Sequence, residues 1–154
     1  DLRYLVHVCV ESQCAKAAAK QQVIEESVEP SGLTVEGDAE AVGEVLKRLL
    51  DNAIKFTPPG GRIGLAAHRC ADSSTVKIIV WDTGPGLTGE QLERLVKPFA
   101  QADGSLARGH DGIGMGLAYV DRMVRMLGGT LDVAPHPGGG SCFTITLGAQ
   151  AQAS

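Results

Sequence analysis

Apolar residues along this chain repeat with two periods, one near 3.6 residues and one of two residues. The sequence predicts helices over residues 2–20, 38–56, 90–96 and 113–127. It predicts strands over residues 22–28, 33–36, 62–69, 75–81, 130–134 and 141–148. The most regular helical stripe lies in 38–56 and consists of Val42, Val45, Leu46, Leu49, Leu50, Ala53 and Ile54.

Polar caps and glycines delimit these segments. Asp38 has a side chain suited to an N-cap, and the Pro-Pro-Gly-Gly run at 58–61 ends the helix behind it. Gly128 and Gly129 end the last predicted helix. Together the elements predict an α+β fold, a two-layer sandwich with a mixed sheet and helices packed on one face.

Length and charge narrow the class of protein. The 154 residues suit one domain, which we place at residues 1–148, with a flexible tail over 149–154. With 14 basic and 18 acidic residues the formal charge is −4, which argues against a nucleic-acid partner. The four cysteines form no C-x-x-C pair, so we expect no zinc site.

Hydropathy bears on location. No apolar run approaches the roughly 20 residues that cross a bilayer, and no charged-then-apolar leader opens the chain. Scattered thiols agree with a reducing compartment. We therefore expect a cytoplasmic domain without direct membrane contact, and any membrane anchor would belong to another part of a longer parent protein.

Four residues of the predicted helix 38–56 share one side beside the apolar stripe. They are Arg48, Asn52, Lys55 and Phe56. An amide oxygen can ligate Mg²⁺, and a lysine can neutralise phosphate. An ordinary solvated helix face would show the same residues, so this pattern alone leaves both interpretations open.

A carboxylate follows the predicted strand 75–81. Asp82 is succeeded by Gly84 and Gly86, which allow a ligand to approach the backbone closely. An ionised carboxylate only accepts hydrogen bonds, so an exocyclic amine such as that of adenine would suit it. A strand-to-helix turn with an exposed aspartate is the alternative. Asp-Thr-Gly is also an aspartic-protease signature, but Pro85 and the long helix disfavour that fold.

A third glycine segment opens the last predicted helix. Gly112, Gly114, Gly116 and Leu117 belong to it, and a polar, glycine-rich loop over 99–111 precedes it. Backbone N–H groups at a helix N-terminus attract phosphate, although the spacing is not the dinucleotide fingerprint. A flexible hinge is the alternative. A loop of this length in a small domain usually carries function or moves.

In this order the segments resemble the histidine-kinase catalytic domain of the Bergerat ATP-binding superfamily. Residues 49–58 resemble its asparagine box, 82–86 its first glycine box, 97–101 its phenylalanine box and 112–117 its second glycine box. The chain from 128 to 143 also fits. The resemblance covers nearly the whole chain and implies a Bergerat-type fold that binds ATP and Mg²⁺.

The resemblance assigns roles by position. Asn52 would ligate Mg²⁺ and Lys55 would contact phosphate, while Asp82 would accept the adenine amine. Arg108 would reach the γ-phosphate from a lid hinged by the second glycine box. The implied nucleotide site comprises Asn52, Lys55, Phe56, Asp82, Gly84, Gly86, Phe99, Arg108, Gly112, Gly114, Gly116 and Leu117.

One position departs from the family pattern. Four residues before Asn52 the kinases usually carry Asn and the hydrolysing relatives carry Glu as general base, whereas this chain has Arg48. We therefore expect no acid or base catalyst within the chain and no ATP hydrolase. Arg48 would either lie over the metal site and weaken Mg²⁺ dependence, or pair with Glu44 one turn earlier.

Two functions follow as hypotheses. In the first, a sensor histidine kinase domain donates the ATP γ-phosphoryl to a histidine on a separate dimerisation domain, and indirectly serves a response regulator. In the second, a signalling pseudokinase module binds nucleotide weakly or not at all and docks partners. His7 is followed by Val8 rather than the acidic residue typical of a phosphoacceptor. We therefore expect the acceptor domain to lie outside this chain.

Overall fold

The computed structural model describes residues 2–28, 38–70, 75–84, 113–135 and 139–148, with only the backbone described for 113–118. Its helices are α1 (Leu2–Ala19), α2 (Ala39–Phe56) and α5 (Ile113–Met126). Its strands are β1 (Val23–Val28), β2 (Arg62–Arg69), β3 (Thr75–Asp82), β4 (Thr130–Pro135) and β5 (Ser141–Gly148). The predicted strand 33–36, helix 90–96, loop 99–111 and tail 149–154 lie outside the described residues.

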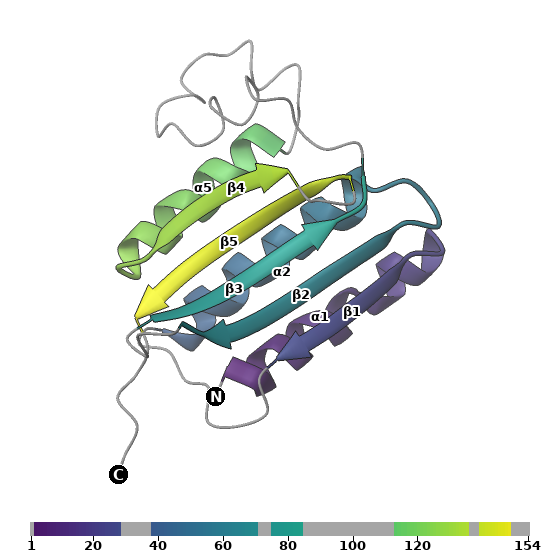
Figure 1. Ribbon diagram of the computed structural model, residues 1–154. Helices are drawn as coiled ribbons and strands as arrows, with labels where there is room; N and C mark the ends of the chain where they lie inside the picture. Colours follow the sequence, from purple (N-terminus) through teal and green to yellow (C-terminus); the bar gives the residue numbers. More distant parts are fainter. Residues whose placement is uncertain (1, 29–37, 71–74, 85–112, 136–138, 149–154) are drawn as a thin grey trace.

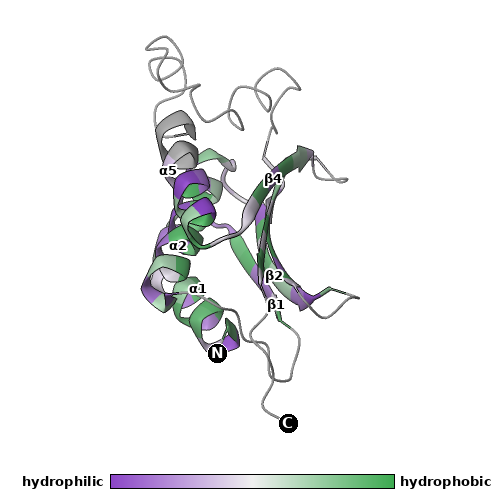
Figure 2. Cartoon of the chain, turned by 90° about the vertical axis from the view of Figure 1, so that its left-hand side faces the viewer, coloured by the Kyte–Doolittle hydropathy of each residue, from purple (hydrophilic) through white to green (hydrophobic). Residues whose placement is uncertain are grey.

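The five strands form one sheet in the order β1-β2-β3-β5-β4. β1 runs parallel to β2, and the other neighbouring pairs are antiparallel. Helices α1, α2 and α5 lie side by side on one face of this sheet (Figures 1 and 2). The predicted two-layer α+β sandwich with a mixed sheet is therefore confirmed.

The core lies between the helix layer and the sheet. Helix α2 occupies the centre of the layer and turns its apolar stripe, including the fully buried Leu46 and Leu50, toward the strands. Alternate residues of the central strands, such as Ile78 and Ile145, meet that stripe because strand side chains point to opposite faces in turn. Figure 2 shows these apolar segments facing one another across the sandwich.

The ends of the helices follow their predicted signals. The Asp38 carboxylate caps α2 by accepting the N–H of Glu40 at 2.8 Å. Gly128 has a φ of +81° just beyond α5, and the N–H of Gly129 bonds the carbonyl of Val124 at 2.9 Å. Among the described residues, none of the helices is long and apolar enough to cross a membrane.

Candidate nucleotide site

Asp82 is the last residue of β3, and the backbone holds its carboxylate in place. The side chain is 9% exposed. Its Oδ1 atom accepts the N–H of Gly84 at 2.9 Å and the N–H of Ser141 at 3.3 Å. Hydrogen bonds from backbone N–H groups favour the ionised carboxylate and fix its direction. Asp82 therefore presents a preorganised hydrogen-bond acceptor at the end of the central strand β3.

Gly140 allows β5 to start directly against Asp82. Its φ is +97°, and a Cβ atom at this position would lie 2.0 Å from the backbone oxygen of Asp82. Gly84 is packed similarly, because its Cβ would lie 3.1 Å from the carbonyl oxygen of Phe56. The structure thus brings the ends of α2 and β3 and the start of β5 together at one end of the sandwich, the upper end in Figure 1. We call this end of the sandwich the site edge.

Sequence reasoning missed Gly140 and Ser141 as site residues. The signal was present in the three consecutive glycines at 138–140, between the predicted strands 130–134 and 141–148, which we had not included in the site. A glycine run before a strand also marks a close backbone approach. Nothing in the local pattern pointed to Asp82 as the group approached, because the two residues are far apart in the chain.

Asn52 lies on α2 below this edge, and its side-chain amide is incompletely bonded. The residue is half-buried, and its Nδ2 atom is buried without a hydrogen-bond partner among the described residues. The Oγ1 atom of Thr57 is also buried without a hydrogen-bond partner among the described residues. Buried polar atoms are normally satisfied, so these two atoms indicate a place where a ligand or ordered water completes the bonding.

Lys55 and Phe56 close the last turn of α2. The Lys55 side chain is exposed, and its Nζ atom lies 5.5 Å from the centroid of the Phe56 ring. Phe56 is 36% exposed, a large fraction for a phenylalanine in a domain of this size. A mobile cation and an accessible ring at the edge beside Gly84 suit contacts with phosphate and with a planar base, respectively.

The end of α2 is held by side chains from the segment that leads into β1. Lys20 Nζ donates to the carbonyl of Ile54 at 2.8 Å. Gln22 Nε2 donates to the carbonyls of Ile54 at 3.1 Å and of Thr57 at 2.7 Å. A cation and an amide therefore satisfy carbonyls that the helix end leaves without intrahelical partners. This anchoring fixes the position of Lys55 and Phe56.

Of the two arrangements expected for Arg48, the structure shows the pairing with Glu44. The Arg48 Nε atom donates to Glu44 Oε1 at 3.0 Å. Its Cζ atom also lies 3.9 Å from the centroid of the Tyr119 ring on α5. The guanidinium is thus directed across the helix layer, because a carboxylate and an aromatic face attract it there.

The glycine segment before α5 is only partly described. Gly86, Phe99, Arg108 and Gly112 lie outside the described residues. Gly114, Gly116 and Leu117 belong to the first turns of α5, which begins at Ile113 and packs against α2 and β4. The N-terminus of α5 lies at the same edge as the ends of α2 and β3 (Figure 1). The prediction that backbone N–H groups here face phosphate stays a prediction.

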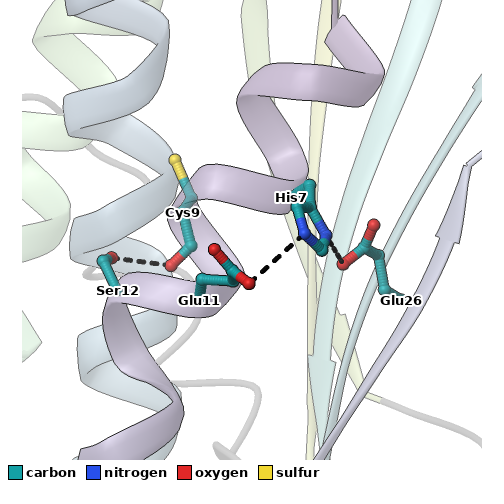
Figure 3. A network of polar contacts seen from close by, with 5 residues as sticks. All are labelled: His7, Cys9, Glu11, Ser12 and Glu26. Atoms are coloured by element: carbon teal, nitrogen blue, oxygen red, sulfur yellow. Dashed lines mark hydrogen bonds and ion pairs between the residues drawn. The ribbon is translucent and has the colours of Figure 1, made fainter.

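His7 and two of the cysteines lie among the described titratable side chains apart from those of α2 and β3. His7 contacts Glu26 through Nδ1 at 3.4 Å and Glu11 through Nε2 at 3.5 Å, which links α1 to β1 at the surface (Figure 3). Burial raises the pKa of the Cys9 thiol above its ordinary value. Burial raises the pKa of Cys142 too, and the nearby Asp82 carboxylate adds to the effect. A raised pKa keeps these two thiols in the neutral form, which is a poor nucleophile.

No group of three or more His, Cys, Asp or Glu side chains gathers as a metal centre within the described part of the chain. Mg²⁺ does not need such a group, because it keeps several waters and binds through few protein groups together with substrate phosphates.

The family model for histidine kinase-, DNA gyrase B- and HSP90-like ATPases matches residues 37–151, a span that holds every residue of the site. The chain belongs to this family. This membership confirms the resemblance drawn from the four sequence boxes. It also removes the aspartic-protease alternative at Asp82, since that residue terminates a strand of an ATPase-type sandwich instead of a mostly-β fold.

Similar proteins within the family include sensor kinases. The chain is 38% identical over 148 residues to the adaptive-response sensory kinase SasA of Thermosynechococcus vestitus, covering 96% of this chain and 38% of that protein. Full-length ShkA, solved in complex with AMPPNP, superposes with a TM-score of 0.81 at 30% identity over 99% of this chain and 31% of its own. The mycobacterial sensor histidine kinase MprB gives 0.79 at 26% identity, over 99% and 97% of the two chains. The chain thus spans well under half the length of SasA and of ShkA.

Proposed function

We propose that this chain is the ATP-binding catalytic domain of a sensor histidine kinase, which donates the γ-phosphoryl group to a histidine on a separate dimerisation domain. The observation that carries the proposal is the Asp82 carboxylate, held by two backbone N–H groups at the edge where α2, β3 and β5 meet. Two findings support ATP as the ligand. Asp82 lies within the residues that match the family model, and the similar protein ShkA was solved in complex with AMPPNP.

Adenine recognition is assigned to Asp82. The carboxylate offers only acceptors, which fits the exocyclic amine of adenine and disfavours the carbonyl that guanine has at the same place. Gly84 and Gly140 keep side-chain atoms away from the carboxylate, and the exposed ring of Phe56 lies at the adjacent end of α2. Gly86, Phe99 and Leu117 complete the proposed base pocket on the basis of the family pattern.

Phosphate and metal binding are assigned to α2 and to the start of α5. Asn52 would ligate Mg²⁺ through its amide oxygen, as the family pattern implies, and Lys55 supplies a cation for the phosphates. Bound Mg²⁺ would neutralise phosphate charge during transfer. Gly112, Gly114 and Gly116 would present N–H groups to phosphate, and Arg108 would approach the γ-phosphate. The chain's own residues then act by binding and alignment, without an acid or base catalyst.

The phosphoacceptor histidine is assigned to another domain. The His7 imidazole contacts the carboxylates of Glu11 and Glu26 on the surface between α1 and β1. The partner is therefore a dimerisation domain that carries the histidine, and a response regulator would receive the phosphoryl group afterwards. A requirement for ATP supports a cytoplasmic location, where ATP is available.

Titration with a fluorescent ATP analogue, with Mg²⁺ and with a chelator, tests the binding step. We expect saturable binding that unlabelled ATP displaces and GTP does not, with tighter binding when Mg²⁺ is present. Incubation with γ-labelled ATP and a histidine-bearing dimerisation domain then tests transfer. Absence of nucleotide binding would refute the proposal, while binding without transfer to any such domain would leave only an ATP-binding module.

A further inference from the structure

Arg48 and Tyr119 form a direct side-chain link between α2 and α5. The Arg48 Cζ atom lies 3.9 Å from the centroid of the Tyr119 ring, the distance of a guanidinium stacked on an aromatic face. The two residues come from the two helices that carry the proposed metal and phosphate contacts. The contact therefore connects the two halves of the site through the helix layer.

Glu44 fixes the guanidinium in this stack. Its Oε1 atom accepts from Arg48 Nε at 3.0 Å, one turn earlier on the same helix. The Arg48 side chain is 42% exposed, so a single exposed ion pair would hold it only weakly. The carboxylate restrains one edge of the planar group and the ring covers its face. Two restraints of different kind select one orientation of a long side chain that would otherwise sample many.

Both residues lie close to the proposed ligand contacts along their helices. Arg48 precedes Asn52 by one helical turn. Tyr119 follows Ile113, the first residue of α5, by about 9 Å of helical rise. Val120 and Val124 are fully buried and attach the remainder of α5 to the core. Tyr119 adds an attachment to α2 on the side of α5 that those valines do not cover.

We infer that Arg48 is a positioning residue, which acts through Tyr119 to hold the start of α5 and its glycine segment at a fixed place relative to Asn52. The inference rests on the proposed ATP site. It gives a physical role to the residue that stands where family kinases carry Asn. The nucleotide-binding arrangement of the two helices is then populated before the ligand arrives, which raises apparent affinity.

This role differs from direct contact with the ligand in its metal dependence. A guanidinium over the metal site would alter the ratio of affinities with and without Mg²⁺. A stack that only orients α5 changes both affinities by the same factor. The expected loss on breaking the stack is about two- to fivefold, the range that corresponds to an exposed cation–π contact.

The test is a double-mutant cycle in the 154-residue chain with the fluorescent ATP analogue. Arg48→Ala, Tyr119→Leu and the double variant should each bind about two- to fivefold more weakly, and equally so with Mg²⁺ and with chelator. The double variant should bind no more weakly than the worse single variant, since both changes remove one contact. Tyr119→Phe keeps the ring and should restore the affinity.

Arg125→Ala is the matched control. Arg125 pairs with Asp121 at 2.9 Å in the same i, i+4 geometry as Arg48 with Glu44, and no aromatic contact joins it to α2 in the described part of the chain. It should leave the affinity unchanged. Thermal unfolding of every variant separates a change in stability from a change in affinity.

Three results would overturn the inference. Wild-type affinity in Arg48→Ala and Tyr119→Leu would show that the stack orients nothing. A loss in Arg48→Ala alone, or one that depends on Mg²⁺, would show that Arg48 contacts the nucleotide itself. If the wild-type chain binds no nucleotide, the proposed function fails, and amide exchange of α5 in the ligand-free variants decides the inference. Exchange that both single variants leave unaltered would then refute it.

Discussion

The contact between Gly140 and Asp82 makes a sharp prediction, because a neighbouring glycine provides the control. Gly139 and Gly140 have φ values of +99° and +97°, so alanine at either position incurs the same backbone strain. A Cβ at Gly139 would meet nothing within 4 Å. A Cβ at Gly140 would lie 2.0 Å from the Asp82 oxygen and 2.7 Å from its carbonyl carbon. The difference between the two variants therefore isolates the contact with Asp82.

The magnitudes follow from these distances. Positive φ costs alanine about 1–2 kcal/mol, and a stiffer unfolded chain offsets about 0.4–1 kcal/mol of that. Gly139→Ala should thus lower the free energy of unfolding by about 1 kcal/mol or less. In Gly140→Ala the backbone of Asp82 or Ser141 must move. Overpacking adds about 1–3 kcal/mol, and loss of the Ser141 N–H bond to the carboxylate adds about 1–3 kcal/mol.

Urea denaturation followed by circular dichroism measures the free energy of unfolding of each variant. Titration with the ATP analogue measures its affinity for nucleotide. Gly140→Ala should unfold at a distinctly lower urea concentration than Gly139→Ala, with an unchanged m-value. It should also bind nucleotide at least about tenfold more weakly, because displacement of the Asp82 carboxylate by a few tenths of an ångström weakens its directed bonds. Equal denaturation midpoints for the two variants would refute the close approach of β5 to Asp82.

Three further predictions concern the site, its support and the thiols. Asp82→Asn should weaken ATP binding by about 2–3 kcal/mol, since the amide turns a donor toward the adenine amine; equal calorimetric affinity would remove Asp82 from the site. Gln22→Met should lower the free energy of unfolding by about 1–3 kcal/mol, because the Thr57 carbonyl loses its side-chain donor while the Ile54 carbonyl keeps only Lys20; an unchanged urea midpoint would contradict this. A maleimide at neutral pH should label the exposed Cys14 well before the buried Cys9, whose pKa burial raises; equal rates by mass spectrometry would show that α1 opens readily.

Much of the fold was predictable because its signals are local. The stripe of α2, the alternation of β3 and β5 and the cap at Asp38 each depend on residues within a few positions of one another. The family boxes are similarly local, so Asn52 and Asp82 were identified as candidates without coordinates. The parallel pairing of β1 with β2 at the edge of the sheet had no such signal, since neither strand specifies its neighbour.

Local patterns in the sequence were enough to identify the helices and strands that the structure describes, the family and the candidate residues for ATP. The packing of distant segments against one another, which no local pattern encodes, sets how those candidates are supported. The N–H of Ser141 reaches Asp82 across 59 residues of chain, and Gln22 reaches Thr57 across 35. Tertiary packing also decided that Arg48 stacks on Tyr119. Periodicity constrains the face on which a side chain emerges, whereas its partner depends on which distant element the fold packs against that face.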